Sequence, residues 1–427
     1  MKNNKDCSLN QILLDQFEKG NIEETHYISR VKTVLTHLAA CGSEVYGFTK
    51  YVCADCHHTE IHYGTCGDAH CPKCGAAIRK RWIEEQTEKA VAATAWHIVF
   101  TNPDLYLNSL ALHDPRFFYN AMFRASSKAI KRLSRNKKYF GCVKPGFFSV
   151  LHTWGSTLSF HPHIHMVLYG AGLDKEGNLV VAKGEERYLF PVQKLAALYK
   201  HCLMAELNKK YGKSGSEWKQ DLDKAARQNW NVQINKGLDH PARAIVYLGR
   251  YVNRVAISNS RIRGYDGRFV TFEYKDYRDH GGFRKEDGRE DRSGARKKLM
   301  KLKAEEFVRR FTLHILPKNF RRTRFYGFLA HGQEESLARM KELTGTPALT
   351  KEGVQKMISG SFGSDERNGE EADEQKYIDE YECPKCHKKM KFSGAAPRVR
   401  ANAYEIRQYL RVRKETGRYE KKVSAKD

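Results

Sequence analysis

Two pairs of cysteines near the N-terminus place the strongest constraint on how this chain can fold. Cys53 and Cys56 form one Cys-x-x-Cys turn, and Cys71 and Cys74 form a second one fourteen residues later. Each turn offers two thiolates, and four thiolates complete a tetrahedral zinc shell. Redox cysteines or reduced buried thiols are the alternative, but two such turns at this separation seldom arise together by chance. We therefore predict a small module closed by a structural zinc ion.

Further cysteines leave the exact ligand set open. Cys66 precedes the second turn in the stretch TCGDAHCPKC, so it can replace one of the four ligands or bind a second metal, and His70 is a further candidate. Far downstream, Cys383 and Cys386 form a single turn. This lone turn is compatible with either a second zinc site or plain thiols.

The charge of the chain indicates a polyanionic partner. Among 427 residues, 75 are Lys or Arg and 50 are Asp or Glu, which gives a formal net charge of +25. Such an excess is typical of proteins that bind nucleic acid, although a basic surface without a specific partner is the alternative. The sequence has no apolar stretch of about 18 residues and no signal-peptide pattern at its start. We therefore expect a cytoplasmic protein without a membrane partner.

The order of helical and strand-like segments predicts the α+β class. Helical spacing recurs in DPRFFYNAMFRASSKAIKRLSRNKK and VQKLAALYKHCLMAELNKKYG. Strand patterns occur in PGFFSVLHTW and LSFHPHIHMVLYG, which Gly155 and Ser156 join as an antiparallel hairpin. Another helix leads into a strand in RKRWIEEQTEKAVAATAWHIVFT. An antiparallel sheet flanked by helices accounts for this order better than a doubly wound parallel sheet.

Three histidines alternate along one of these strands, in FHPHIHMVLYG at residues 160–170. Side chains two apart on a strand share a face, so His161, His163 and His165 point one way and the apolar residues between them point the other. The imidazoles can converge on a metal ion or can line a wet cleft. His152, on the preceding strand, is a further candidate ligand.

Two tyrosines one helical turn apart offer a nucleophile. The stretch DHPARAIVYLGRYVNRVAI predicts a helix that starts at Pro241. Tyr247 and Tyr251 lie at the border between its apolar stripe and an arginine stripe formed by Arg243, Arg250 and Arg254. Such a pair can be purely structural, with packed rings and hydrated hydroxyls. It can also attack a DNA phosphodiester while arginines hold the phosphates and a histidine-bound metal polarises the scissile group.

These motifs together resemble the rolling-circle transposases of the IS91 group, within the His-hydrophobic-His endonuclease superfamily. The resemblance covers most of residues 30–332 and rests on CADC, TCGDAHCPKC, AWHIVFTNPDL, LHTWGSTLSFHPHIHMVLYG, AIVYLGRYVNRVAIS and EEFVRRFTLHILPKNFRRTRFYGFLAHG. It implies a nuclease domain with His163 and His165 as metal ligands and Tyr247 and Tyr251 as the tyrosine pair. The implied reaction nicks and rejoins single-stranded DNA at transposon ends and target sites through a 5′-phosphotyrosine.

The resemblance implies Mg²⁺ or Mn²⁺ as the catalytic metal, beside the structural Zn²⁺. Imidazole ligands favour Mn²⁺, whereas cellular abundance favours Mg²⁺. The third ligand is His152 or His161; we favour His152, because Pro162 makes the path of the chain after His161 uncertain. No phosphate-binding loop of the helicase type is visible, so we expect host factors to unwind the DNA.

We divide the chain into five parts on this basis. They are an N-terminal zinc-binding DNA-recognition domain (1–90), a tyrosine nuclease domain (91–275), a basic helical DNA-binding extension (276–358), a disordered acidic linker (359–376) and a basic tail with the lone cysteine turn (377–427). In the extension, we expect Arg321, Arg322 and Arg324 to contact phosphates while neighbouring aromatic rings stack on bases. A solvated basic helix face is the alternative for these arginines.

Two other functions remain compatible with the same residues. A plasmid or phage rolling-circle replication initiator would use the same chemistry, and flanking transposon ends would distinguish the two. A non-catalytic zinc protein that binds DNA would form no covalent adduct. The zinc module itself can recognise the transposon end or simply brace the nuclease domain.

Overall fold

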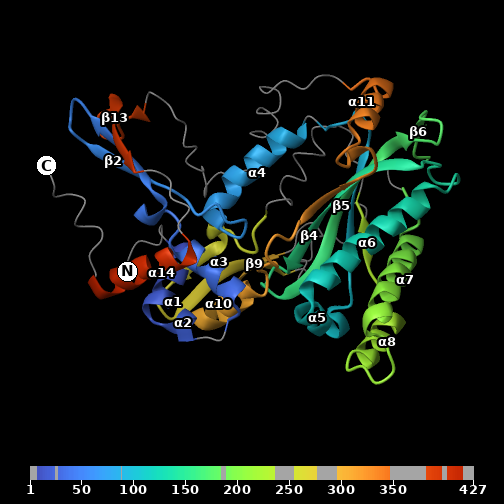
Figure 1. Cartoon of the computed structure of the whole chain (residues 1–427), viewed down its shortest axis with the longest axis horizontal. Helices are drawn as coiled ribbons and strands as arrows, with labels where there is room; N and C mark the ends of the chain where they lie inside the picture. The colour runs from blue at the N-terminus through green and yellow to red at the C-terminus, as the bar shows by residue number, and fades with distance from the viewer. Residues whose placement is uncertain are drawn as a thin grey trace. The chain divides into compact units, whose positions relative to one another are not determined.

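The computed structural model describes residues 7–24, 27–87, 89–183, 189–235, 254–276, 296–346, 381–396 and 402–416 (Figure 1). Its contacts divide the chain into two compact units, each built from segments that are far apart in the sequence. Unit 1 comprises residues 1–78, 255–315 and 364–427, and unit 2 comprises residues 79–254 and 316–363. Both units combine helices with antiparallel sheets, which confirms the predicted α+β class.

Unit 1 contains two sheets and a group of short helices. One sheet has the strand order β12-β13-β1-β2 and the other has the order β10-β9-β8. The main elements are α1 (Leu9–Glu18), α2 (Asn21–Glu24), α3 (Ser29–Ala39), β1 (Phe48–Cys53), β2 (Thr59–Tyr63), β8 (Ile262–Tyr265), β9 (Phe269–Asp276), β10 (Arg296–Lys303), α10 (Ala304–Thr312), β12 (Tyr381–Glu382), β13 (Lys389–Ala396) and α14 (Ala403–Thr416). Helix α4 (Pro72–Thr87) begins in unit 1 and ends in unit 2.

These units do not follow the linear division expected from the sequence. Residues 255–275, expected in the nuclease domain, belong to unit 1, where the Tyr265 hydroxyl donates to Asp15 of α1 and accepts from Gln16 Nε2 at 3.1 Å. Strand β13, expected in a separate tail, pairs with β1 over Phe48–Cys53. Local patterns do not reveal which distant strand completes a sheet, so the linear division missed both associations. The expected acidic linker, residues 359–376, lies outside the described residues.

Unit 2 is a six-stranded antiparallel sheet flanked by helices. Its strand order is β11-β4-β5-β3-β7, with β6 paired to β5. The elements are β3 (Ala95–Thr101), α5 (Asp104–His113), α6 (Pro115–Ser134), β4 (Lys144–Trp154), β5 (Phe160–Leu173), β6 (Leu179–Val181), α7 (Val192–Tyr211), α8 (Lys219–Arg227), β7 (Val232–Ile234), β11 (Thr323–Tyr326), the 3-10 helix η5 (Gly327–Leu329) and α11 (Glu334–Leu343). Among the described residues, no helix is long and apolar enough to cross a membrane.

Strands β4 and β5 form the predicted hairpin. Strand β4 ends at Trp154 and β5 begins at Phe160, and the Gly155 amide donates to the Ser159 carbonyl across the turn at 2.9 Å. Phe100 of β3 pairs with Ile164 of β5 and packs on the ring of Tyr199 in α7, 4.9 Å between centroids. The apolar residues between the histidines therefore face the helices, as predicted.

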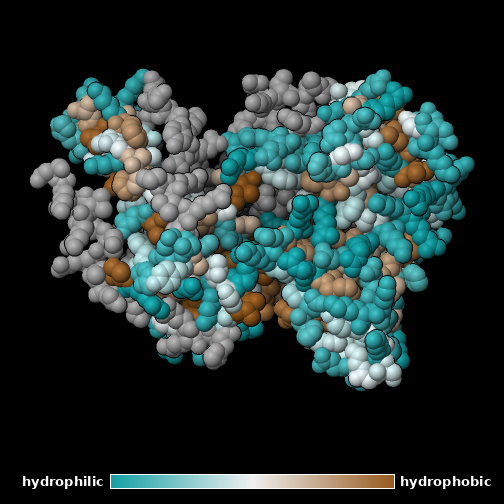
Figure 2. All heavy atoms as spheres, viewed as in Figure 1, coloured by the Kyte–Doolittle hydropathy of each residue, from teal (hydrophilic) through white to brown (hydrophobic). Residues whose placement is uncertain are grey.

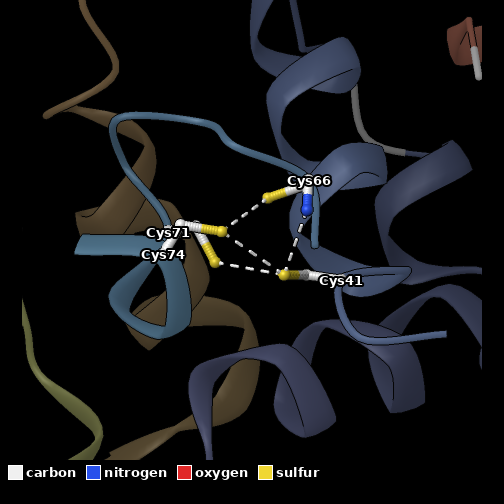
Figure 3. A group of neighbouring side chains, drawn as sticks. All are labelled: Cys41, Cys66, Cys71 and Cys74. Carbon is white, nitrogen blue, oxygen red and sulfur yellow. Dashed lines mark hydrogen bonds between the residues drawn. The ribbon is translucent and has the colours of Figure 1, made fainter. Parts of the chain in front are cut away.

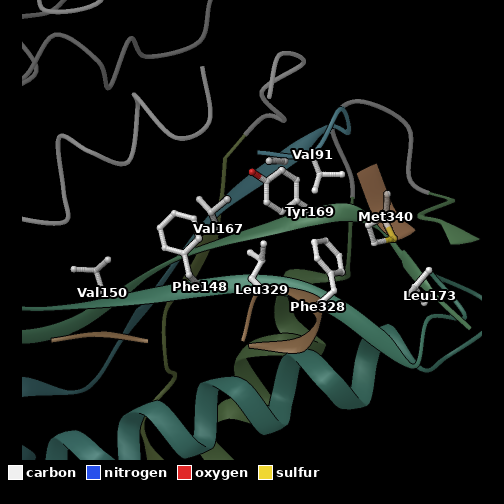
Figure 4. Close-up of a cluster of buried hydrophobic side chains, with 11 residues drawn as sticks. Val91, Phe148, Val150, Val167, Tyr169, Leu173, Phe328, Leu329 and Met340 are labelled. Carbon is white, nitrogen blue, oxygen red and sulfur yellow. The ribbon is translucent and has the colours of Figure 1, made fainter. Parts of the chain in front are cut away.

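The opposite face of the hairpin changes character along its length. At one end, Phe148, Val167 and Tyr169 belong to a buried apolar cluster that also contains Phe328 and Met340 (Figure 4). Further along the same two strands, the residues on this face become histidines. The apolar end holds the strands in place, and the histidine end is left to bind a ligand.

Two glycines allow η5 to lie directly against β4. A Cβ on Gly146 would come within 2.1 Å of the Phe328 ring, and a Cβ on Gly327 would come within 1.5 Å of the Pro145 carbonyl oxygen. Phe328 is fully buried, so its ring cannot turn outward without exposing apolar surface to solvent. The close approach of these two segments therefore requires glycine at both positions.

We predict that Gly146→Ala destabilises unit 2 by about 1–3 kcal/mol, the usual cost of overpacking a core. The readout is the melting temperature of the full chain. A smaller side chain at position 328 should relieve this clash. The double variant Gly146→Ala with Phe328→Leu should therefore lose less stability than the sum of the losses in the two single variants. Strictly additive losses would contradict the proposed steric contact.

Candidate functional site

Three histidines from the β4–β5 hairpin form a compact cluster in unit 2. The ligand nitrogens of His152, His163 and His165 all lie within 4.8 Å of one another. His152 is paired directly with His163 across the two strands, so the register of the hairpin brings them together. His152 and His165 are buried and His163 is partly exposed, which leaves one side of the cluster accessible. His152 is thus the third member of the cluster, as favoured from the sequence.

The spacing of the nitrogens suits a divalent metal. The Nε2 atoms of His163 and His165 are 3.0 Å apart. Two adjacent ligands of an octahedral ion with bonds of about 2.1 Å would be separated by about 3.0 Å. The donor set of three imidazoles is of a type that first-row transition metals accept readily. These residues therefore fit a metal ion.

His161 is turned away from this cluster. Its Nδ1 lies 2.5 Å from Asp104 Oδ2 at the start of α5. Its backbone carbonyl still contributes, because it accepts a hydrogen bond from His163 Nδ1 at 2.7 Å. A carbonyl oxygen can only accept, so the proton of neutral His163 is on Nδ1 and the Nε2 lone pair is available for a metal. The His161 backbone thus orients a ligand, whereas its side chain is not one.

A fourth histidine, His97 of β3, supports the cluster from behind. Its Nε2 lies 2.9 Å from His165 Nδ1, and its Nδ1 lies 2.9 Å from the side-chain amide of Asn235. For His165 to bind a metal through Nε2, its proton must be on Nδ1 and be donated to His97. His97 then donates through Nδ1 to Asn235, whose amide can present its oxygen by rotation. Sequence analysis missed both residues, because neither forms a motif with the histidine strand.

Burial keeps these imidazoles neutral. It lowers the pKa of His163 to about 3 and that of His97 to about 4, and it also lowers the pKa of His165. The positive charge of Arg254 lowers the pKa of His163 and His165 further. At neutral pH no proton competes for the nitrogens of His163 and His165, so these two residues are in the protonation state that metal binding requires.

The predicted tyrosine helix lies outside the described residues. The residues concerned are Tyr247, Tyr251, Arg243 and Arg250, all within residues 236–253. Both flanking residues, Asn235 and Arg254, are described. Asn235 contacts His97, and the charge of Arg254 acts on His163 and His165.

A basic groove of about 1180 Å³ runs between α6 and β11 in unit 2. The surface over α6 is predominantly hydrophilic (Figure 2). None of the described residues that line the groove is acidic. Its cationic residues on α6 recur at helical spacing, and others come from the β11 segment: Arg116, Arg124, Lys128, Lys131, Arg132, Arg135, Arg321 and Arg324. Phe320, Phe325 and Tyr326 provide aromatic surface beside these charges.

The three arginines predicted to bind DNA take different positions around β11. Arg321 and Arg324 line the groove, and the Arg324 guanidinium stacks on the Phe123 ring at 4.1 Å. Arg322 lies closer to the histidine strand: its carbonyl accepts from the Leu151 amide at 3.0 Å and its Nη1 donates to the Arg254 carbonyl at 3.2 Å. Basic side chains are therefore present both in the groove and beside the cluster.

In unit 1, four cysteines converge at the start of α4 (Figure 3). They are Cys41, Cys66, Cys71 and Cys74. Their sulfurs are 3.6–3.7 Å apart in the pairs Cys41–Cys74, Cys66–Cys74 and Cys41–Cys71. A tetrahedron with Zn–S bonds of about 2.3 Å has an edge of about 3.8 Å. The four thiols therefore fit a structural zinc ion.

Backbone amides stabilise the negative charge that zinc binding requires. The amides of Cys66 and Gly67 donate to the sulfurs of Cys41 and Cys74 at 3.4 and 3.3 Å. Hydrogen bonds from the other three cysteines, Cys41 first, lower the pKa of Cys74. His70 is not part of this cluster, because its Nδ1 contacts Asp68 Oδ1 at 2.7 Å.

This grouping corrects the ligand set predicted from the sequence. The two adjacent turns lie in different clusters: Cys71 and Cys74 join Cys66 and Cys41, whereas Cys53 and Cys56 lie with Cys383 and Cys386. All five predicted cysteines are cluster members, but in two clusters. Cys41 was missed because a single cysteine outside a Cys-x-x-Cys turn has no recognisable spacing. The chain has eleven cysteines, and eight of them lie in the two clusters. The number of cysteines is therefore a signal in the sequence that could have suggested two four-cysteine sites.

We predict that His152→Ala weakens Mn²⁺ binding by roughly 10-fold or more, because it removes one of three ligands. His161→Ala is the matched control and should retain most of the affinity, since its side chain faces Asp104. Calorimetric titration of the full chain with Mn²⁺ measures both. A larger loss in His161→Ala than in His152→Ala would contradict the assignment of the third ligand.

Comparison with known proteins identifies two family domains in the chain. A family model described as "transposase zinc-binding domain" matches residues 13–102, and one described as "putative transposase" matches residues 146–336. The first range includes the whole Cys41 cluster, and the second includes the three histidines.

Two curated relatives match over most of their lengths. "Putative transposase y4qJ" of Sinorhizobium fredii is 30% identical over 342 residues, which are 77% of this chain and 82% of the relative. The transposase for insertion sequence element IS801 of Pseudomonas savastanoi pv. phaseolicola is 28% identical over 341 residues, 75% of this chain and 74% of the relative. No solved structure matches the chain significantly. The chain belongs to the IS91 family of transposases and has the zinc-binding domain of that family near its N-terminus.

Proposed function

We propose that this transposase nicks and rejoins single-stranded DNA by tyrosine transesterification at the histidine cluster, in rolling-circle transposition of an insertion sequence. Tyr247 and Tyr251 are the proposed nucleophiles. The observation that supports the proposal is the environment of the two described residues next to this stretch of sequence. Asn235 contacts His97 behind the cluster, and the charge of Arg254 lowers the pKa of His163 and His165.

The proposed step exchanges one phosphodiester for another. The tyrosine oxygen attacks the phosphorus, the bond to the 3′ oxygen breaks, and the 5′ phosphate becomes linked to tyrosine. The phenol proton is released, and the leaving 3′ oxygen takes up a proton to give a free 3′-hydroxyl. Attack by a 3′-hydroxyl on the phosphotyrosine reverses these changes and joins the strand to a new end. With two tyrosines, two such phosphotyrosine links can form one after the other.

His152, His163 and His165 would hold the divalent metal, Mg²⁺ or Mn²⁺. When bound, the ion would polarise a non-bridging phosphate oxygen and offset the charge that develops on the phosphoryl group. Three neutral imidazoles suit Mn²⁺ better than Mg²⁺, which prefers oxygen ligands. His97 and Asn235 keep His165 in the tautomer that presents Nε2.

Arginines beside the cluster would position the scissile phosphate. Arg254 and Arg322 are linked by the hydrogen bond from Arg322 Nη1 to the Arg254 carbonyl. Each guanidinium can donate two parallel hydrogen bonds to one phosphate and neutralise part of its charge. Holding the phosphate near the imidazoles converts the attack into an effectively intramolecular step.

The α6–β11 groove would bind the single strand on either side of the reacting phosphate. Its lysines and arginines can neutralise successive phosphates, and Phe320 and Phe325 can stack on unpaired bases. A duplex buries its bases, so the combination of charge with accessible rings favours unpaired DNA. The absence of acidic residues among the described lining residues also favours a polyanion.

We predict that the full chain, incubated with Mn²⁺ and a labelled single-stranded transposon end, forms a protein–DNA adduct that survives denaturation. Replacement of both tyrosines, Tyr247→Phe with Tyr251→Phe, should abolish the adduct, because Phe lacks the nucleophilic oxygen. Denaturing gel electrophoresis measures the band.

A matched double variant tests whether the loss is specific to these tyrosines. Tyr139→Phe with Tyr274→Phe removes two other hydroxyls and should leave the adduct unchanged. No band in the wild type, or a band that persists without Tyr247 and Tyr251, would refute the proposed nucleophiles.

We predict that Lys128→Ala with Arg132→Ala weakens binding of single-stranded DNA and flattens its salt dependence. Loss of two phosphate contacts should reduce the slope of log K against log salt by about 1.4. Lys209→Ala with Lys213→Ala removes the same charge from the end of α7, outside the groove lining, and should change the slope much less. Fluorescence anisotropy with a labelled oligonucleotide at several salt concentrations measures this, and equal slopes for the two variants would argue against the groove.

A further inference from the structure

We propose that Cys53, Cys56, Cys383 and Cys386 hold a second structural zinc ion, which joins the N-terminal zinc-binding domain to the C-terminal part of the chain. The matched family domain spans residues 13–102 and so includes only half of this ligand set. The four sulfurs all lie within 4.8 Å of one another. The two halves of the site are separated by more than 300 positions in the sequence.

The distances between the sulfurs are those of a tetrahedral thiolate site. Cys53 Sγ is 3.5 Å from Cys386 Sγ, and Cys56 Sγ is 3.6 Å from Cys383 Sγ. These values are close to the edge of about 3.8 Å expected for Zn–S bonds of about 2.3 Å. They are far longer than the disulfide bond length of about 2.05 Å.

The two cysteine turns have the same backbone conformation. The His57 amide donates to the Cys53 carbonyl at 3.1 Å, and the His387 amide donates to the Cys383 carbonyl at 2.8 Å. Both histidines lie in the left-handed region, with φ values of 55° and 59°. This conformation is costly for residues other than glycine, and its occurrence at both turns indicates a shared requirement. Each turn presents its two sulfurs to the other.

Sheet pairing brings the two turns together. Strand β13 is paired with β1 along Phe48–Cys53, and Cys53 is opposite Met390 at the end next to the cysteines. Strands β12 and β13 flank the turn of Cys383, as β1 and β2 flank the turn of Cys53. The result is a four-stranded sheet made of two hairpins (Figure 1). The four sulfurs lie together where the cysteine turns of these hairpins meet.

This sheet has too little apolar surface to be stable by itself. Among the described residues, its buried cluster consists of Cys53, Cys383 and Met390, and the partly buried residues packed on it are Tyr51, Cys56 and Cys386. Small modules of this kind usually require a metal or a disulfide. Cys53 and Cys383 are fully buried, so their thiolates would need a cation to compensate for lost hydration. A bound zinc ion satisfies both requirements, because its binding free energy contributes directly to folding.

The experiment measures the number of zinc ions per chain in the purified full-length protein, from elemental analysis and the protein concentration. We expect two zinc ions per chain in the wild type and one in Cys383→Ser with Cys386→Ser. The matched control, Cys7→Ser with Cys202→Ser, changes two cysteines outside both clusters and should retain two. One zinc in the wild type, or two in Cys383→Ser with Cys386→Ser, would overturn the proposal.

A conservative variant separates ligand loss from misfolding. Cys383→His keeps the number of ligands, because zinc accepts three cysteines and one histidine, and should retain two zinc ions. The double serine variant could lose both ions through misfolding. In that case, two zinc ions per chain in Cys383→His would support the proposed site, and one zinc ion per chain would overturn it. Thiol titration of the denatured wild type tests for disulfides. Four thiols fewer than the number of cysteines, together with a single zinc ion, would show that these four cysteines form two disulfides and would overturn the proposal.

Discussion

The register between β4 and β5 determines where the chemistry of unit 2 is located. Pairing of His152 with His163 places three imidazoles on one face, while Phe148 and Val167 on the same face enter the apolar cluster. A slip of one residue would move the histidines to the helix-covered face and expose the apolar residues to solvent. The apolar cluster therefore fixes the metal-binding geometry, because the register that buries one set of side chains also gathers the other.

The two kinds of metal environment are separated by their ligand chemistry. The two clusters found among the described residues of unit 1 consist of thiols, and thiolates select zinc and leave no open position when four are present. Unit 2 contains a cluster of neutral imidazoles with one member partly exposed, and such a site retains room for substrate. Burial contributes to this separation, since it keeps His163 and His97 unprotonated at neutral pH.

Much of the local structure followed from sequence patterns. The alternation in β5, the turn at Gly155 and the helical spacing of α6 and α7 are short-range features, so the sequence predicted them correctly. The choice of His152 over His161 also agrees with the structure, in which Asp104 binds His161. The roles of His97 and Asn235 were not predictable, because the pairing of β3 with β5 and β7 brings them together from distant positions.

By itself, the sequence determined the α+β class, the types of metal ligand and the family, because these depend on residue types at short spacing. Only the tertiary structure decided which cysteines share a site. Cys53 has Cys56 as a neighbour in sequence, but its other two partners, Cys383 and Cys386, come from the turn before β13, the strand that pairs with β1. A tetrahedral shell depends on where four sulfurs meet in space. Once β13 has paired with β1, cysteines that are far apart in the sequence can share one site.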